Sequence, residues 1–289
     1  MFANIVLRNQ LIIILIIINS LFGCSIPKHT DSDDFSTQNM PGEEIERLGD
    51  VYLNQGNLQL AMIQYDKFLK LNPENTRVRY KKGLLFLKGR MNEAAIREFQ
   101  EVIKKDPEHA LSHQGLGGAF FRIKNHENAV KHLNKALYLE PKLWKANNLL
   151  GIIYDYQKKY DLAIQKYNDA IELKPAKGLL YNNLGISYSL NGEYEKAIQA
   201  FNKALKNSSS DARIYNNIGI ALSKLGKYQL AMEAFKKGGD EAQAYNNLGF
   251  VYLKQGDRQS AIRSFEKAIE SRPTFYIKAS ENLKKAKTK

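Results

Sequence analysis

Cysteine is almost absent from this chain of 289 residues, in which Cys24 is the only one. A lone cysteine excludes an internal disulfide, so packing has to stabilise the fold. Tryptophan also occurs only once, but 44% hydrophobic and 25% charged residues exclude disorder throughout the chain. An unbroken apolar run occurs at residues 11–18. Its eight residues are too few to cross a bilayer as a helix, which takes ~20.

The first two dozen residues have the layout of an export signal. Arg8 precedes the apolar run, and Leu21-Phe22-Gly23-Cys24 follows it. This tetrapeptide resembles the bacterial lipobox, in which a peptidase cleaves before a cysteine that carries a diacylglycerol thioether. The resemblance implies a signal peptide over 1–23, lipid anchoring through Cys24, and a position in the bacterial envelope, at the outer membrane facing the periplasm. Residues 24–41 continue with a stretch rich in Ser, Thr, Asp and Pro, which predicts a flexible tether.

Small and large residues then recur together at a fixed period. Glycines follow one another at intervals of 34 residues, with a last interval of 30, at Gly49, Gly83, Gly117, Gly151, Gly185, Gly219 and Gly249. Twelve residues past each glycine is an alanine, namely Ala61, Ala95, Ala129, Ala163, Ala197, Ala231 and Ala261. Sixteen residues past each glycine is a large apolar residue. Such self-similarity indicates one helical unit repeated seven times.

This pattern resembles the tetratricopeptide repeat over residues 42–275. The resemblance implies an all-α, right-handed superhelical solenoid of seven helix pairs, each with a helix A and a helix B. The expected repeats are 42–75, 76–109, 110–143, 144–177, 178–211, 212–241 and 242–275. Residues 276–289 predict a basic capping helix in which Ile277 and Leu283 are the expected buried side chains. In the short sixth repeat, Gly238 and Gly239 are expected to end helix B, and Asp240 to cap the next helix A.

The A helices of such a stack line its concave side, and their polar residues form a candidate binding surface. Asparagines lie two or three residues before the glycine, at Asn148, Asn182, Asn183, Asn216, Asn217, Asn246 and Asn247. An apolar strip lies one residue after it, at Ile152, Ile186, Ile220 and Phe250. A primary amide both donates and accepts, so a column of amides can hold a peptide backbone whatever its side chains. The family resemblance implies this role for Asn183, Asn217 and Asn247. The alternative is that these asparagines make only local hydrogen bonds.

Other functions are poorly supported by the sequence. The net charge of +13 suggests nucleic acid, but the lysines are spread along the repeats and the aromatic residues are committed to the core. His109 and His113 lie four residues apart without a third metal ligand at a suitable spacing. The stretch 115–118, with its three glycines, lies inside an expected helix and follows no strand, so it is not a phosphate loop. We expect no enzyme activity, no cofactor, no metal and no nucleic-acid partner.

The sequence therefore predicts a membrane-anchored scaffold that binds other proteins or extended peptides in the concave groove. The short sixth repeat and the segment 239–249 resemble the tetratricopeptide lipoproteins of tight-adherence (Flp) pilus assembly, which implies a role in assembling a pilus or secretion machine. Two alternatives share the fold, the anchor and the groove. One is a pilotin-like lipoprotein that delivers a secretin, and the other is an adaptor that organises cell-wall hydrolases.

Overall fold

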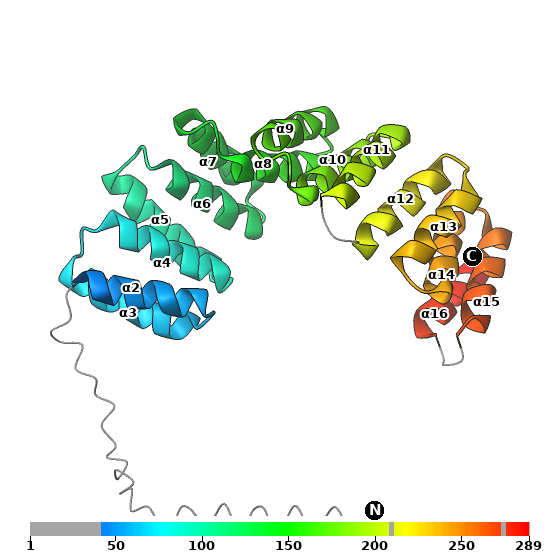
Figure 1. Ribbon diagram of the computed structural model, residues 1–289, viewed down its shortest axis with the longest axis horizontal. Helices are drawn as coiled ribbons and strands as arrows, with labels where there is room; N and C mark the ends of the chain where they lie inside the picture. Colours follow the sequence, from blue (N-terminus) through cyan, green and yellow to red (C-terminus); the bar gives the residue numbers. More distant parts are fainter. Residues whose placement is uncertain (1–41, 208–210, 273–275, 289) are drawn as a thin grey trace, which may run out of the picture. The chain divides into compact units, whose positions relative to one another are not determined.

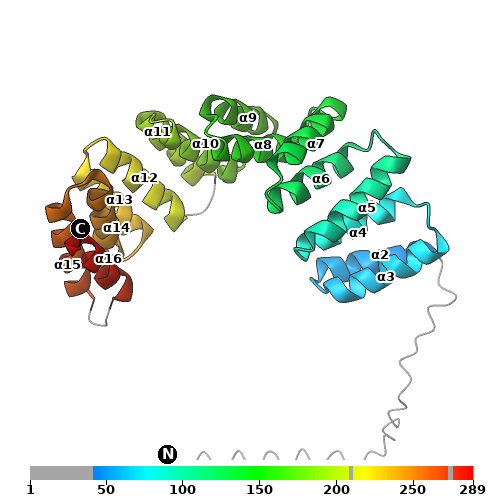
Figure 2. The ribbon, with the colours of Figure 1, turned by 180° about the vertical axis from the view of Figure 1, so that it is seen from behind.

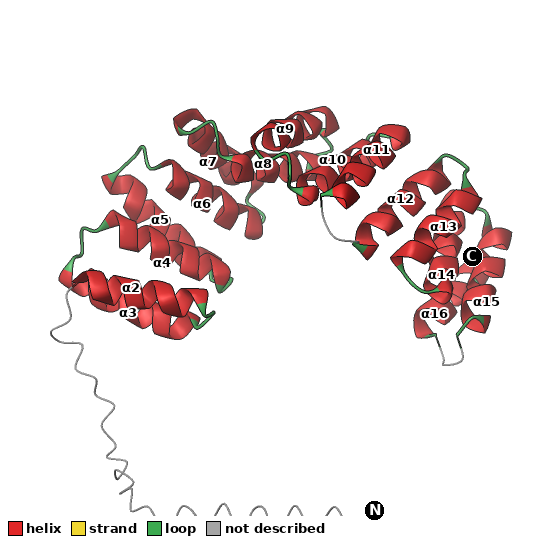
Figure 3. Cartoon of the chain, viewed as in Figure 1, coloured by secondary structure: helices red, strands yellow, loops and turns green. Residues whose placement is uncertain are grey.

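The structure, a computed structural model, describes residues 42–207, 211–272 and 276–288. Within these ranges it consists of helices joined by short turns, without a strand (Figure 3). None of the helices in this part of the chain combines the length and apolar character that crossing a bilayer requires. The expected signal peptide, Cys24 and tether lie outside the described residues.

The helices alternate between the two members of each repeat. The A helices are α2 (Gly42–Asn54), α4 (Thr76–Lys88), α6 (Ala110–Arg122), α8 (Trp144–Tyr156), α10 (Gly178–Leu190), α12 (Ala212–Lys224) and α14 (Glu241–Gln255). The B helices are α3 (Leu58–Leu71), α5 (Asn92–Lys105), α7 (His126–Leu139), α9 (Tyr160–Leu173), α11 (Tyr194–Lys206), α13 (Tyr228–Gly238) and α15 (Arg258–Glu270). The last described helix is α16 (Ile277–Lys287).

Each helix packs on its neighbours in the chain. An A helix contacts the B helix of its own repeat, and that B helix contacts the next A helix (Figure 1). The same order is visible from the opposite side in Figure 2. The A helices of adjacent repeats also contact one another from α4 to α14, and α16 packs on α14 as a further A helix would. These contacts give a continuous A-helix face. The expected fold of seven helix pairs with a C-terminal helix is confirmed.

Small residues at the repeat period let helices A and B approach closely. All seven periodic alanines are fully buried, each at 0% exposure. At Gly185 a Cβ atom would lie 2.5 Å from the ring of Phe201, closer than real side chains approach. The ring therefore occupies the space that any larger residue at position 185 would need. Close packing at these sites determines how the pairs nest.

The turn between helices A and B uses the left-handed backbone conformation in every repeat. Gly56, Gly192, Gly226 and Gly256 adopt it with φ between 74° and 86°. In the other three repeats non-glycine residues adopt it, at Arg90, Lys124 and Lys158, with φ between 58° and 62°. A glycine is therefore favoured at this turn but not required, because a single residue can tolerate the strain.

The sixth repeat ends as the sequence predicts. Helix α13 stops at Gly238, and Asp240 caps α14 through a reciprocal pair of bonds with Gln243. The backbone N–H of Gln243 donates to Oδ1 of Asp240 at 2.7 Å, and the backbone N–H of Asp240 donates to Oε1 of Gln243 at 3.2 Å. This capping box allows a new helix to begin directly after a shortened one.

The expectation for α16 was only partly right. Leu283 packs against the cluster that contains Phe265, but Ile277 is wrong as a buried residue, since it is 61% exposed. The buried side chains of α16 are Ala279 and Ala286. They lie seven residues apart, or about two turns, and so share one face, whereas Ile277 is two residues from Ala279 and points away.

Candidate peptide-binding groove

The asparagines of the A-helix face are hydrogen-bonded to one another across repeat boundaries. The side-chain amide of Asn183 on α10 donates to Oδ1 of Asn148 on α8 at 2.9 Å. Equivalent bonds join the later helices in the pairs Asn217–Asn182 (3.2 Å), Asn247–Asn216 (3.1 Å) and Asn282–Asn246 (2.9 Å). Each of these hydrogen bonds therefore links an A helix to the next one. The asparagines do make local hydrogen bonds, as the alternative interpretation expects.

This role leaves most of the asparagines with free hydrogen-bonding capacity. A donor such as Asn183 keeps its carbonyl oxygen and one N–H, and its acceptor Asn148 keeps both N–H groups. Both side chains are half-buried, so a peptide can still reach them. Asn246 differs, because it is only 2% exposed and its contact is with the capping helix. Asn282 was missed by sequence reasoning, although it lies 36 residues past Asn246, close to the spacing of 35 in the pair of Asn183 and Asn148.

The apolar strip lies beside these amides on the same face. Ile152 and Ile186 are half-buried, whereas Ile220 and Phe250 are 45% and 46% exposed. Two adjoining pockets of about 320 Å³ each open along this strip, and both include Ile186 and Leu190 in their walls. One lies between α8 and α10, and the other extends to Ile220 on α12. We call the surface formed by α8, α10, α12 and α14, with its amides and these two pockets, the groove.

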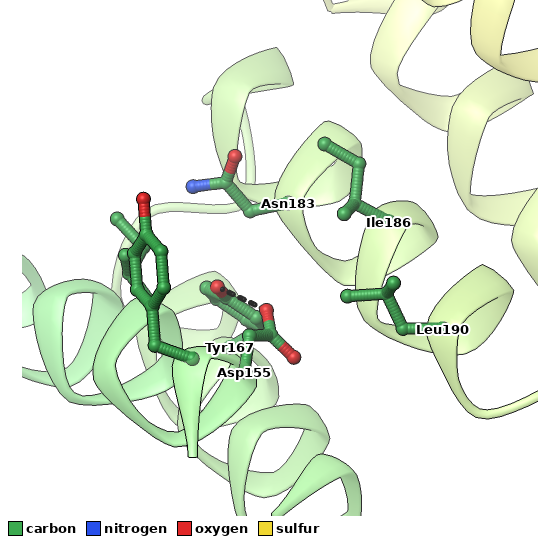
Figure 4. Close-up of a pocket in the computed structure, with 7 residues that line it drawn as sticks. Asp155, Tyr167, Asn183, Ile186 and Leu190 are labelled. Atoms are coloured by element: carbon green, nitrogen blue, oxygen red, sulfur yellow. Dashed lines mark hydrogen bonds between the residues drawn. The ribbon is translucent and has the colours of Figure 1, made fainter. Parts of the chain in front are cut away.

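The pocket between α8 and α10 contains an acidic group that the sequence patterns did not reveal. Figure 4 shows Asp155 and Tyr167 on one side of this pocket and Ile186 and Leu190 on α10. The hydroxyl of Tyr167 donates to Oδ2 of Asp155 at 2.8 Å, and the hydroxyl of Ser187 donates to Oδ1 at 2.8 Å. Burial raises the pKa of Asp155, while the two hydroxyl donors act in the opposite direction. Asp155 lies three residues past Ile152, so the two side chains share one side of α8, and both are half-buried.

The A-helix face of the first two repeats has a different character. Nζ of Lys81 on α4 lies 2.7 Å from Oε1 of Glu46 and 2.5 Å from Oδ2 of Asp50, both on α2. Arg77 also contacts Glu46, at 2.5 Å, and Glu46 is buried. These ion pairs join the two repeats where the later repeats use asparagine bonds. The groove is therefore formed by the A helices of the last four repeats.

The histidines considered as metal ligands each have another partner. Nδ1 of His109 accepts from the backbone N–H of Ser112 and caps α6, at 3.1 Å. Nε2 of His113 lies 3.1 Å from the carbonyl oxygen of Pro107, and Nδ1 of His113 lies 3.0 Å from Nδ1 of His132. A carbonyl only accepts, so Nε2 of His113 is protonated and its Nδ1 accepts from Nδ1–H of His132. In residues 42–207, 211–272 and 276–288, no three His, Cys, Asp or Glu side chains are grouped to hold a metal ion.

This histidine pair predicts a loss of stability in acid. Burial and the neighbouring His113 lower the pKa of His132 from 6.5 to about 4, with Lys131 adding to the effect. A group whose pKa is lower in the folded state contributes stability above its unfolded pKa and loses it as the pH falls. Unfolding free energy should therefore fall by about 1–3 kcal/mol between pH 7 and pH 4.5 through this residue.

Urea unfolding followed by circular dichroism across this pH range measures the effect. His132→Gln retains a hydrogen-bonding side chain without titrating, so its profile should be flatter than that of the wild type. Asn134→Gln, an exchange at an exposed position of the same helix that removes no titrating group, should leave the slope unchanged. If unfolding free energy depends on pH equally steeply in the wild type and in His132→Gln, His132 is not the source of the acid sensitivity.

Comparison with known proteins agrees with this architecture. Models of the tetratricopeptide repeat match residues 46–75, 80–147, 145–177, 166–199, 187–226 and 242–275. The chain belongs to the tetratricopeptide repeat family, whose repeats form scaffolds for protein–protein interaction. No curated protein matches it in sequence.

Solved structures show the same fold. A structure of MamA protein is 27% identical, with a TM-score of 0.51, and the match covers 60% of this chain and 94% of that one. A tetratricopeptide repeat protein from Parabacteroides merdae is 18% identical, with a TM-score of 0.60 and coverage of 85% and 98%. A structure of pilF from Pseudomonas aeruginosa is 21% identical, with a TM-score of 0.56 and coverage of 73% and 97%. At 18% and 21% identity, the last two structures show similarity of fold alone.

Proposed function

We propose that this protein is a lipid-anchored scaffold of the bacterial envelope that holds an extended segment of a partner protein in the groove. The observation that carries the proposal is the combination of exposed Ile220 and Phe250 with amides that keep free donors and acceptors. Apolar residues left uncovered beside polar groups are typical of an interaction surface.

The anchoring part of the proposal rests on Cys24 and the segment before it. Lipidation there would place the repeats at the outer membrane, facing the periplasm, on the tether of residues 24–41. The role in assembling a pilus or secretion machine rests on the resemblance of segment 239–249 to tight-adherence lipoproteins. In that role, the groove would hold a subunit of the machine during its assembly.

An exchange at the apolar strip tests the groove as the binding surface. Ile220→Asp adds a charge at an exposed position, so the fold should be kept, but a partner would have to desolvate the carboxylate. Losing the burial of one such side chain costs about 1.5–3 kcal/mol, or a tenfold or greater loss of affinity. We expect chemically cross-linked envelope proteins to co-purify with Ile220→Asp at a tenth of the wild-type yield or less.

The control is Leu162→Asp, because Leu162 lies on a B helix, α9, and is 44% exposed, nearly as much as Ile220 at 45%. This variant should retain the wild-type yield. Circular dichroism should give equal helicity for all three proteins. Equal yields for both variants would rule out the groove as the site of capture.

A further inference from the structure

Asp155 occupies an otherwise mostly apolar pocket without a compensating cation. Its neighbours in the walls include Ile152 on the same helix. Across the pocket lie Ile186 and Leu190 on α10 (Figure 4). Both groups that donate to its carboxylate are neutral hydroxyls, those of Tyr167 and Ser187. Among the described residues, no lysine, arginine or histidine forms a salt bridge with it. A carboxylate in partly buried surroundings is costly unless an opposite charge approaches it.

The first repeat contains the same kind of pair with its cation in place. The hydroxyl of Tyr65 donates to Asp50 at 2.7 Å, as that of Tyr167 donates to Asp155. Tyr65 and Tyr167 occupy the same position of their repeats, sixteen residues past the glycine. In the first repeat, Lys81 from the next A helix reaches the carboxylate at 2.5 Å.

The position of Lys81 is taken by an amide in the later repeat. Lys81 lies two residues before Gly83, and the residue two before Gly185 is Asn183. Asn183 lines the pocket beside Asp155 and is bonded to Asn148. The chain therefore supplies a lysine to the tyrosine–aspartate pair in one repeat and leaves an open pocket of about 320 Å³ beside the pair in the other.

We propose that this pocket binds the side chain of one lysine or arginine residue of the partner segment, with the charged head at Asp155. The proposal rests on the proposed function, because the segment lies in the groove. The aliphatic stem of such a residue would cover Ile152, Ile186 and Leu190 while its head stays polar. The ring of Tyr156, which is 71% exposed and also lines the pocket, offers a face to the cation.

The adjoining pocket limits how basic the partner can be. It is lined by Lys224 and includes no carboxylate among its lining residues. With a net charge of +13 on the whole chain, a strongly basic segment would be repelled. The groove should therefore select a segment with a single basic residue next to apolar or acidic ones, and reject a polybasic one.

A positional-scanning library of fluorescent decapeptides, acetylated and amidated at their ends, tests this selection on the full chain purified in detergent. The wild type should favour Lys or Arg at one position. Asp155→Asn should weaken that preference about tenfold, since a hydrogen bond to a charged group contributes about 1.5–3 kcal/mol. Asp155→Lys should reverse the preference towards Asp or Glu at the same position.

Asp50→Asn is the matched control, because its carboxylate is already paired with Lys81. It should leave the preference unchanged. Peptides that bind without any preference for a basic residue, or a preference that survives in Asp155→Asn, would overturn this inference while leaving the groove as the binding surface. If no peptide binds, or if Ile220→Asp binds all peptides as well as the wild type, the proposed function fails together with it.

Discussion

A Cys24→Ser variant should incorporate no palmitate analogue and should leave the membrane fraction. Cys24 is the only thiol in the chain, so no other residue can form the thioether. Each buried methylene of an acyl chain contributes ~0.8 kcal/mol, and a single chain gives only reversible membrane binding. The expected lipoprotein carries two or more chains, and their loss should release the protein completely. Metabolic labelling followed by fractionation measures both effects.

Ser25→Ala, one residue further along, serves as the control and should keep both the label and the membrane position. The variant Cys24→Ser should also leave the groove intact, so its binding of library peptides should match that of the wild type. Label on Cys24→Ser, or membrane retention without label, would show that the anchor lies elsewhere.

The architecture could be predicted from the sequence because its determinants are local and periodic. Ala197, for example, is buried as the interval of 34 predicts, and Asp240 caps α14 as its place after two glycines predicts. In a repeat fold each unit packs only against its neighbours, so a correct prediction of the structure of one unit applies to the other units as well. The capping helix lies past the last periodic glycine and alanine, so these residues gave no register for it, and Ile277 was placed wrongly.

The chemistry of the groove was harder to predict from the sequence, because it depends on contacts between residues far apart in the chain. The bond between Asn183 and Asn148 spans 35 residues, and its existence depends on how far one A helix is displaced along the next. Asp155 carries no pattern of its own, since the other repeats have unrelated residues at its position. Only the packing of α8, α9 and α10 brings Ser187 and Tyr167 to its two oxygens.

The glycines at the repeat period should tolerate no side chain, which distinguishes them from Gly118 on the same kind of helix. In Gly185→Ala the added Cβ would lie 2.5 Å from the ring of Phe201, which is buried at 1% exposure and cannot move aside. Overpacking of this kind costs typically ~1–3 kcal/mol, more than the gain in helix propensity of ~1 kcal/mol when alanine replaces glycine.

Gly118 provides the opposite case. It lies on α6, one residue after a periodic glycine, and no atom comes within 4 Å of a Cβ added there. Gly118→Ala should therefore keep the propensity gain without a clash, and raise the unfolding free energy by ~0.5–1 kcal/mol.

Urea unfolding of these two variants, followed by circular dichroism, is the most direct test that close approach at the repeat glycines builds this fold. The urea midpoint should fall for Gly185→Ala and rise for Gly118→Ala relative to the wild type. If Gly185→Ala is as stable as Gly118→Ala, the helices of a pair are not held together at these glycines, and the packing described for all seven repeats is wrong.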